Sequence, residues 1–486
     1  MTIFLISLAV LIGGYFVYGL LMEKIVGLDP SRVMPAYTKR DGVDFMPLPA
    51  WKVFLIQFLN IAGLGPIFGA IMGIMFGPAA FLWIALGTIF AGAVHDFCAG
   101  VISIRMGGAS LPETVGRELG PGIKQFMRAF SVILLIFVAA VFVITPAGLL
   151  SAMTLHSLDT MFWIFCIFAY YMLATLLPID KLIGNLYPIF GFALLFMAAG
   201  ILGVMLFSPD VTIPVSFDSS FASRMGDIKP VFPMMFVSIA CGAISGFHAT
   251  QSPMMARCLT NEKLARPIFY GAMVAEGIVA LIWAAAAVAF TGGYEQLAAY
   301  MAVEGHSAGT LVHDVSFGWL GAFGGILAVL GVIAAPITTG DTALRSARLT
   351  VADLMHLKQS TIVRRLMVAL PLFAVTAVVM SVDYQVLWRY FAWSNQTLAV
   401  FTLWTITVYL ARRNKPYIIS LLPAMFMTAV CSTYLLAAPT PEGFGIDYPT
   451  AVSIGAAVSL LVTAMFFYSK SRLSAPESEL SPELWT

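Results

Sequence analysis

At the centre of the apolar stretch 51–76 lies Asn60-Ile61-Ala62-Gly63-Leu64-Gly65-Pro66-Ile67-Phe68-Gly69. An apolar stretch of this length predicts a membrane-spanning helix. Glycine lowers helix stability by about 1 kcal/mol and proline by about 3 relative to alanine. Backbone groups that such residues free at bilayer depth must be satisfied by protein, an ion or a substrate. The segment therefore predicts a broken helix near the membrane midplane.

A second interrupted stretch, 231–250, has the same character. It contains Ile239-Ala240-Cys241-Gly242-Ala243-Ile244-Ser245-Gly246-Phe247-His248, followed by Ala249-Thr250-Gln251. Glycine and proline also occur in ordinary membrane helices, where they allow close packing or kinks. Two breaks at equivalent positions favour a binding site, because discontinuous helices hold the solute in many secondary transporters.

The composition requires a membrane. The chain has 486 residues, of which 60% are hydrophobic and 10% charged, and its mean hydropathy is +0.92. Thirteen stretches are long and apolar enough to span a bilayer: 2–22, 51–76, 79–103, 125–149, 158–178, 186–207, 231–250, 268–291, 317–340, 364–382, 386–410, 416–437 and 450–469. The formal net charge of +1, without a basic stripe, argues against a nucleic-acid partner.

The positions of the basic residues predict the orientation. Of the 26 lysines and arginines, all except Arg224, Lys229 and Arg389 fall in connectors on one side of the predicted spans. Cytoplasmic loops of membrane proteins carry such an excess. We therefore expect an outside N-terminus and a cytoplasmic C-terminus.

The predicted fold is an all-α integral membrane protein with a five-plus-five inverted repeat. Spans two and seven run in opposite directions, and each opens a set of five helices. The expected organisation is an extra N-terminal helix and cytoplasmic loop (1–50), a first repeat (51–207), an extracellular loop (208–230), a second repeat (231–410), two added helices (411–469) and a cytoplasmic tail (470–486).

Ionisable side chains inside predicted spans are the candidates for proton coupling, because burying them in a membrane is costly. His95 and Asp96 lie in span three and Glu276 in span eight. A carboxylate next to an imidazole suits a proton relay. The alternatives are a structural salt link for His95 and Asp96, and a neutral, hydrogen-bonded Glu276.

The substrate is expected at the breaks, where main-chain groups and nearby polar side chains face a cavity. The candidate residues are Asn60, Gly63, Gly65, Gly242, Ser245, Gly246, His248, Gln251, Asn395 and Gln396. Side chains of this kind can donate to a carboxylate or amide substrate. The alternative for the side chains is a satisfied interhelical hydrogen bond.

Span nine and the start of span eleven supply candidates for an ion site and a gate. After Pro336, Thr338 and Thr339 offer hydroxyl oxygens that suit Na⁺, although threonine hydroxyls also bond back to helix carbonyls. Asp341 and Arg389 are candidate gate residues. The alternative for Arg389 is snorkelling to the headgroups.

The sequence argues against an enzyme. It contains no GxSxG or HExxH motif, and its five cysteines have no zinc-type spacing. No cofactor is expected beyond a coupling H⁺ or Na⁺, and the expected partners are a small-molecule substrate and the bilayer. A passive channel and a membrane sensor are the remaining alternatives.

Several segments together resemble the carbon starvation protein A family of bacterial membrane transporters. They are Asp41-Gly-Val-Asp-Phe45, Ile61-Ala-Gly-Leu-Gly-Pro-Ile67, His95-Asp-Phe97, Ile239 to His248, Thr338-Thr-Gly-Asp-Thr342, Trp388-Arg-Tyr-Phe391 and Asn395-Gln396. The resemblance implies an uptake system in the bacterial plasma membrane for scarce carbon sources. Family members are linked to peptides and, in some cases, to pyruvate taken up with protons.

More remotely, the five-plus-five arrangement resembles the leucine-transporter-like fold of the amino acid-polyamine-organocation superfamily. This resemblance implies a Na⁺ site formed by the carbonyls of Leu59, Ala62 and Ala335 and the hydroxyls of Thr338 and Thr339. A second Na⁺ site would need a side-chain ligand where this chain has Pro66. At most one such ion is therefore expected.

Overall fold

A computed structural model describes residues 1–154, 158–176, 183–209, 211–212, 230–359, 361–440 and 442–470. The described residues form helices and connecting loops, without a β-strand. Most of the predicted extracellular loop 208–230 and nearly all of the predicted tail 470–486 lie outside the described residues.

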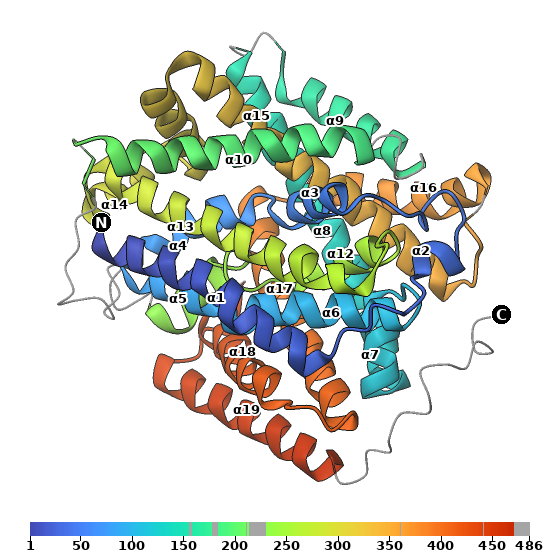
Figure 1. The fold of residues 1–486 in the computed structure, drawn as a ribbon. Helices are drawn as coiled ribbons and strands as arrows, with labels where there is room; N and C mark the ends of the chain where they lie inside the picture. The colour runs from blue at the N-terminus through green and yellow to red at the C-terminus, as the bar shows by residue number, and fades with distance from the viewer. Residues whose placement is uncertain are drawn as a thin grey trace.

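The helices form one bundle of mostly elongated rods (Figure 1). Their bounds are α1 Thr2–Val26, α2 Pro35–Thr38, α3 Ala50–Ile61, η1 Gly65–Gly69, α4 Ala70–Ile74, α5 Ala79–Gly87, η2 Thr88–Gly92, α6 Ala93–Arg105, α7 Leu111–Leu119, α8 Pro121–Met153, α9 Thr160–Leu176, α10 Ile183–Phe207, η4 Val231–Met235, α11 Phe236–Ser238, α12 Gly246–Ala256, η5 Glu262–Leu264, η6 Arg266–Tyr270, α13 Gly271–Thr291, α14 Tyr294–Ala302, α15 Ala308–Leu354, α16 Ile362–Val379, α17 Tyr384–Arg412, α18 Ile418–Ala437 and α19 Tyr448–Lys470.

The chain is a multi-pass membrane protein. Among the described residues, eight helices are long and apolar enough to cross a bilayer, or up to ten if each of two bent pairs counts as one span. Large apolar side chains such as Phe165 and Phe207 are 72% and 85% exposed, which suits contact with lipid.

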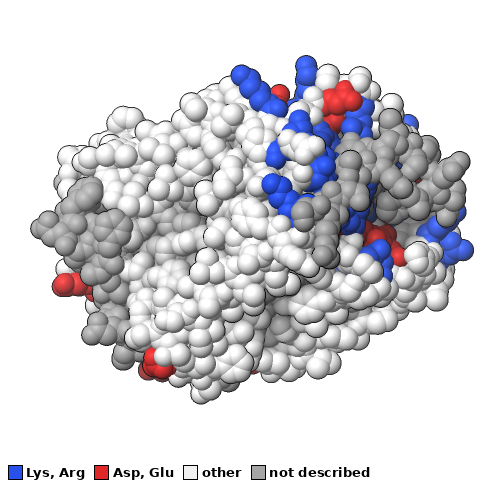
Figure 2. Space-filling model, turned by 90° about the horizontal axis from the view of Figure 1, so that it is seen from below, with Lys and Arg blue, Asp and Glu red and all other residues white. Residues whose placement is uncertain are grey.

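The charged side chains are segregated. Figure 2 shows lysines and arginines gathered at one end of the molecule, while the rest of this face is almost uncharged. We call this the basic end, and Figure 1 shows α2 and α7 on this side of the molecule. Arg32, just before α2, binds Glu262 at 3.0 Å, and Arg105, at the end of α6, binds it at 2.7 Å.

Both predicted helix breaks are present. Helix α3 ends at Ile61, residues 62–64 are not helical, and the chain resumes at Gly65 with a bend of 53°. The second break is longer, because α11 ends at Ser238 and α12 begins only at Gly246. Every residue of both breaks is buried, so neither faces lipid.

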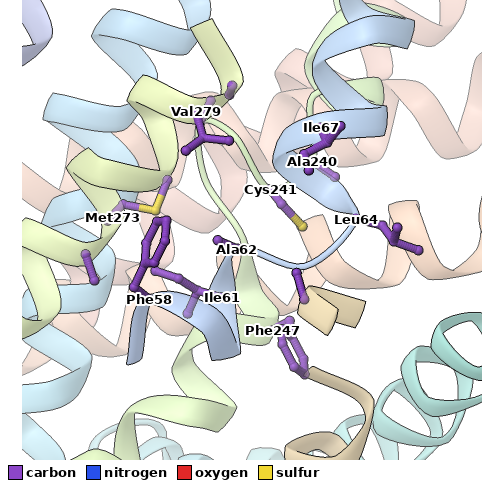
Figure 3. Packing of buried hydrophobic residues seen from close by; sticks show 14 of the residues in the cluster. Phe58, Ile61, Ala62, Leu64, Ile67, Ala240, Cys241, Phe247, Met273 and Val279 are labelled. Carbon is purple, nitrogen blue, oxygen red and sulfur yellow. The ribbon is translucent and has the colours of Figure 1, made fainter. Parts of the chain in front are cut away.

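The two breaks pack directly against each other. A Cβ atom on Gly65 would overlap the Cβ and Sγ atoms of Cys241, and one on Gly69 would lie 2.9 Å from the carbonyl oxygen of Ser238. Figure 3 shows the unwound backbone after Ala62 passing beside Cys241. Glycine is required in the first break because only a residue without a side chain permits this approach.

Helix α15 contains a third distortion that the sequence analysis did not predict. It bends by 74° between Ile326 and Ala328, and Gly321 has a positive φ of 66°. The helix packs against α8 and α10, and its second half carries Pro336 and the predicted ion ligands.

We expect Gly65→Ala to destabilise the protein, because the new methyl group forces the two breaks apart. Overpacking of this kind costs about 1–3 kcal/mol. The measurement is the thermal unfolding midpoint of the detergent-purified protein. Gly148→Ala is the matched control, since a Cβ atom there meets nothing within 4 Å. Equal midpoints for the two variants would contradict the close contact.

Candidate functional site

A chain of four buried ionisable side chains lies beside the second break. The Nδ1 atom of His95 lies 2.7 Å from Oδ1 of Asp96, and Nδ1 of His248 lies 2.9 Å from the other oxygen of Asp96. The Nε2 atom of His248 lies 3.4 Å from a carboxylate oxygen of Glu276. All four side chains are fully buried.

The four side chains form a linear row, and this geometry decides what the row can do. Its order is His95, Asp96, His248 and Glu276, and the donor atoms do not converge on one point. Within the part of the chain that the structure describes, no group of three or more His, Cys, Asp or Glu is arranged to hold a metal ion. Alternating carboxylates and imidazoles in contact suit the movement of a proton.

His248 belongs to this chain, although the sequence analysis assigned it to the substrate. It lies in α12, while Asp96 lies in α6 and Glu276 in α13. The 152 residues that separate His248 from Asp96 explain why no spacing pattern revealed the contact. His95 and Asp96, although adjacent in one helix, do reach each other through their side chains.

Two amide side chains on α3 are buried without partners. Among the described residues, neither end of Gln57 or Asn60 has a hydrogen-bond partner, and both side chains are completely buried. Residues three apart share a helix face, so the two amides lie together in the last turns before the first break. Buried polar groups are almost always paired, so this exception indicates a ligand or water. Gln57 was not among the site residues predicted from the sequence.

Gln251, in α12, is partly engaged. Its amide nitrogen donates to the hydroxyl oxygen of Thr250 at 2.8 Å. Its Oε1 atom has no partner among the described residues. Its helix packs against α3, which carries Gln57 and Asn60.

Asn395 and Gln396 hold the second break in place. The Oδ1 atom of Asn395 accepts from the Ser245 hydroxyl at 3.0 Å and from the Phe247 N–H at 2.7 Å. The amide nitrogen of Gln396 donates to the carbonyls of Ala240 at 2.8 Å and Ile244 at 3.1 Å. These contacts satisfy backbone groups that the missing helical turns leave free.

The candidate glycines are covered by neighbouring helices. A Cβ atom on Gly63 would lie 2.9 Å from the ring of Phe142 and 3.0 Å from the hydroxyl of Thr339. A Cβ atom on Gly246 would overlap the backbone of α17. Gly242 presents its carbonyl to the hydroxyl of Thr88, which donates at 3.0 Å.

Four of the five predicted Na⁺ ligands are brought together by side-chain contacts. The hydroxyl of Thr339 lies 3.0 Å from the carbonyl oxygen of Leu59 and 2.9 Å from that of Ala335. The hydroxyl of Thr338 donates to Ala335 at 2.8 Å. Ala62 lies in the adjacent break. These oxygens suit a hard cation, and the threonines also show the back-bonding that was the alternative.

The two predicted gate residues lie in different places and have different partners. Asp341 is fully buried and accepts a hydrogen bond from the Tyr187 hydroxyl at 2.7 Å. Arg389 is partly exposed and binds Glu442 at 3.0 Å. Glu442 was not among the site residues predicted from the sequence.

The fold is that of a multi-pass membrane protein, and it is shared with proteins of known structure. Two solved structures of mutants of a manganese transporter from Eremococcus coleocola superpose with a TM-score of 0.51, covering 87% of this chain and 95% of theirs. The sequence identity is 13%, so this likeness concerns the fold alone.

The family follows from the sequence comparison. The family described as carbon starvation protein CstA matches residues 1–155 and 146–318. An uncharacterized membrane protein of Haemophilus influenzae is 44% identical over 336 residues, which are 59% of this chain and 90% of that protein. The chain belongs to the carbon starvation protein CstA family, as its motifs indicated.

Relatives with named activities match over a shorter share of their length. The pyruvate/proton symporter BtsT of Escherichia coli is 28% identical over 340 residues, covering 57% of this chain and 47% of that one. The peptide transporter CstA of Bacillus subtilis is 28% identical over 356 residues, covering 59% and 58%. The matches thus span about half of these two transporters.

We expect Asn395→Leu to destabilise the protein, because it leaves the Ser245 hydroxyl and the Phe247 N–H buried without an acceptor. Each such loss costs about 1–3 kcal/mol. Asn60→Leu is the control of the same size and should leave the thermal midpoint unchanged or raised, since its amide has no partner to lose. If the two substitutions have the same effect on the midpoint, Asn395 does not hold the break.

Proposed function

We propose that the protein is a secondary-active uptake transporter that moves a small organic solute by alternating access. The solute we propose is pyruvate or a related carboxylate, or a short peptide, taken up under carbon limitation. The observation that carries this proposal is the contact between two buried helix breaks, next to amide groups without partners. Unwound backbone at bilayer depth is a binding surface in transporters of this type.

The proposed architecture is thirteen spans with a five-plus-five inverted repeat. The first repeat would run from α3 to α10 and the second from η4 to α17, with α1, α18 and α19 as additions. Each repeat would then open with a broken helix. By the positive-inside rule, the basic end faces the cytoplasm, which places the N-terminus outside.

The proposed solute site lies between the breaks. Gln57, Asn60 and Gln251 offer unpaired amide atoms that match a carboxylate or a peptide group. Helix α12 begins at Gly246, and a helix N-terminus favours an anion by roughly 0.3–1 kcal/mol at exposed sites and more when water is excluded. A pyruvate/proton symporter and peptide transporters among the relatives agree with this chemistry.

Proton coupling is proposed to run through the His95–Glu276 chain. His248 sits on the third residue of α12, directly after the break, and links Asp96 of α6 to Glu276 of α13. A movement of α12 that opens the solute site would therefore separate His248 from these carboxylates. Protonation would then favour one conformation over the other, which is the requirement for symport. The alternative is a purely structural link between the three helices.

Coupling to Na⁺ is the second candidate mechanism. The hydroxyl of Thr339 joins α15 to the carbonyl of Leu59 at the end of α3, next to the first break. A cation there would hold the same two helices together.

The proposal is tested in proteoliposomes. Labelled pyruvate, other small carboxylates and di- or tripeptides are offered under an imposed H⁺ or Na⁺ gradient. We expect concentrative, saturable uptake that an inward H⁺ gradient drives. If neither gradient drives accumulation of any of these solutes, symport is wrong, and unsaturable flux without a gradient would identify a channel.

We expect Glu276→Gln to abolish H⁺-driven accumulation but to retain exchange of labelled for unlabelled solute. The substitution keeps the side-chain shape and removes the carboxyl group that can bind and release a proton. Thr338→Ala is the matched variant: it should leave H⁺-driven uptake intact and reduce any Na⁺ dependence. An equal loss of accumulation and exchange in both variants would indicate damage to the fold and contradict separate coupling roles.

A further inference from the structure

At the basic end, a tight turn directs the carboxylate of Asp44 towards the protein interior. The loop lies between α2 and α3, and the Oδ1 atom of Asp41 accepts the N–H groups of Val43, Asp44 and Phe45 at 2.8 to 2.9 Å. This arrangement fixes the turn and directs Asp44 inward, where the residue is only 4% exposed.

Two buried guanidinium groups of α15 meet this carboxylate. Arg345 donates to Oδ1 of Asp44 at 3.0 Å, and Arg348 lies 3.3 Å from Oδ2. Both arginine side chains are fully buried. Arg345 also donates to the carbonyl of Ala174 at the end of α9, and Arg348 to Gln359 at 2.8 Å.

The carboxylate stays charged at neutral pH. Burial by itself would raise the pKa of Asp44, but the guanidinium groups of Arg348 and Arg345 hold that pKa below its ordinary value. The two guanidinium groups thus face a charged Asp44, and Asp341, one turn before Arg345 in α15, also interacts with both electrostatically. Planar guanidinium groups suit the two oxygens of a carboxylate, whichever molecule supplies it.

The same loop contacts two helices that carry parts of the proposed solute and ion sites, α12 and α15. The guanidinium of Arg257, which follows α12, stacks over the ring of Phe45 at 4.9 Å and donates to the carbonyl of Gly108 at 2.9 Å. The N–H of Leu48 donates to the carbonyl of Cys258 at 3.1 Å. The loop thus joins the end of α12 to α15 and to the connector after α6.

A small polar cavity lies beside the loop. Its volume is about 10 Å³, which is about the room needed for one water molecule. The lining includes Arg257 and five hydroxyl residues: Ser110, Ser131, Thr250, Ser346 and Thr350. Thr250 is two residues from His248 in α12, so the same helix contributes to the cavity and to the proposed proton pathway.

We propose that Arg345 and Arg348 form an anion site on the cytoplasmic side, that Asp44 occupies this site while the gate is closed, and that a transported carboxylate displaces Asp44 when the gate opens. The inference rests on the proposed function, because it takes the solute as a carboxylate and the basic end as cytoplasmic. The hydroxyl-lined cavity is then the closed part of the exit route.

Cys258 provides a reporter for this gate. It is completely buried, and its Sγ atom lies 4.0 Å from the backbone oxygen of Asp44. Burial, with a smaller contribution from the charge of Asp44, raises the pKa of the thiol to about 12. Because the thiolate is the reactive form, Cys258 should react slowly while the loop is in place.

The experiment measures the rate at which a membrane-impermeant maleimide labels Cys258 from the cytoplasmic side. The full-length protein is used, with its other cysteines (Cys98, Cys166, Cys241 and Cys431) replaced. We expect millimolar pyruvate to accelerate labelling. Without pyruvate, Asp44→Asn should accelerate labelling about tenfold or more, which corresponds to a shift of about 1.4 kcal/mol in the opening equilibrium. Labelling of this variant should no longer respond to pyruvate. Asp44→Glu, which keeps the carboxylate, is the matched control.

Two further measurements separate the explanations. Thr350→Cys in a Cys258→Ser background places the thiol in the cavity. If Asp44→Asn accelerates labelling at this position too, the gate has opened, and the effect is not only the loss of the Asp44 charge beside Cys258. Arg348→Gln tests the other half of the ion pair and should also accelerate labelling. If both thiols are labelled no faster in Asp44→Asn than in Asp44→Glu, the Asp44 carboxylate does not hold the gate closed and the proposal is wrong.

The outcome also distinguishes this inference from the proposed function. If labelling of Asp44→Asn is fast but no carboxylate accelerates labelling of the protein with Asp44 intact, the displacement is wrong and Asp44 is only a structural latch. If proteoliposomes accumulate none of the tested solutes while Asp44→Asn is still labelled faster than Asp44→Glu, the transport proposal is wrong, but the closure of the loop by the Asp44–arginine ion pairs stands. An identical pyruvate response in Asp44→Asn and Asp44→Glu would also overturn displacement.

Discussion

The rest of this structure depends on the contact between two stretches of unwound backbone inside the bilayer. Gly65 lies against Cys241 so closely that a methyl group on the glycine would overlap the cysteine side chain. In hydrocarbon, such backbone persists only when its polar groups have partners. Those partners come from other helices: Thr88 binds Gly242, and Asn395 and Gln396 bind the residues around Ser245. The breaks are therefore held by a specific set of contacts.

Buried polar groups divide into two sets with different meanings. Asn395 and Gln396 form hydrogen bonds with the protein backbone, so their loss would expose the break itself. Gln57 and Asn60 have no partner among the described residues, although they are buried just as fully. A stable fold gains nothing from an unpaired buried amide. A binding site does, because the ligand supplies the missing partner.

The sequence predicted what depends on local chemistry and missed what depends on distant contacts. Glycine and proline at Gly63, Gly65 and Pro66 revealed the first break, because their effect on a helix is local. The same sequence named His95, Asp96 and Glu276 but could not show that His248 joins them, since a hydrogen bond across 152 residues leaves no spacing pattern. The bend of α15 was missed although Gly324 and Gly325 directly precede it, because glycine is also common in ordinary membrane helices and no proline lies closer than Pro336.

The Asp44 cluster and the Arg389–Glu442 pair differ in burial, and on the proposed mechanism this difference fits one state of a transport cycle. At the basic end, Asp44 is buried with two fully buried arginines. Near the start of α17, Arg389 forms an ion pair with Glu442, and the arginine side chain is 36% exposed. Exposed pairs contribute little and open easily, whereas breaking a buried pair leaves an uncompensated charge. On the proposed mechanism, the buried cluster opens when a solute that carries a carboxylate supplies the negative charge that Asp44 withdraws.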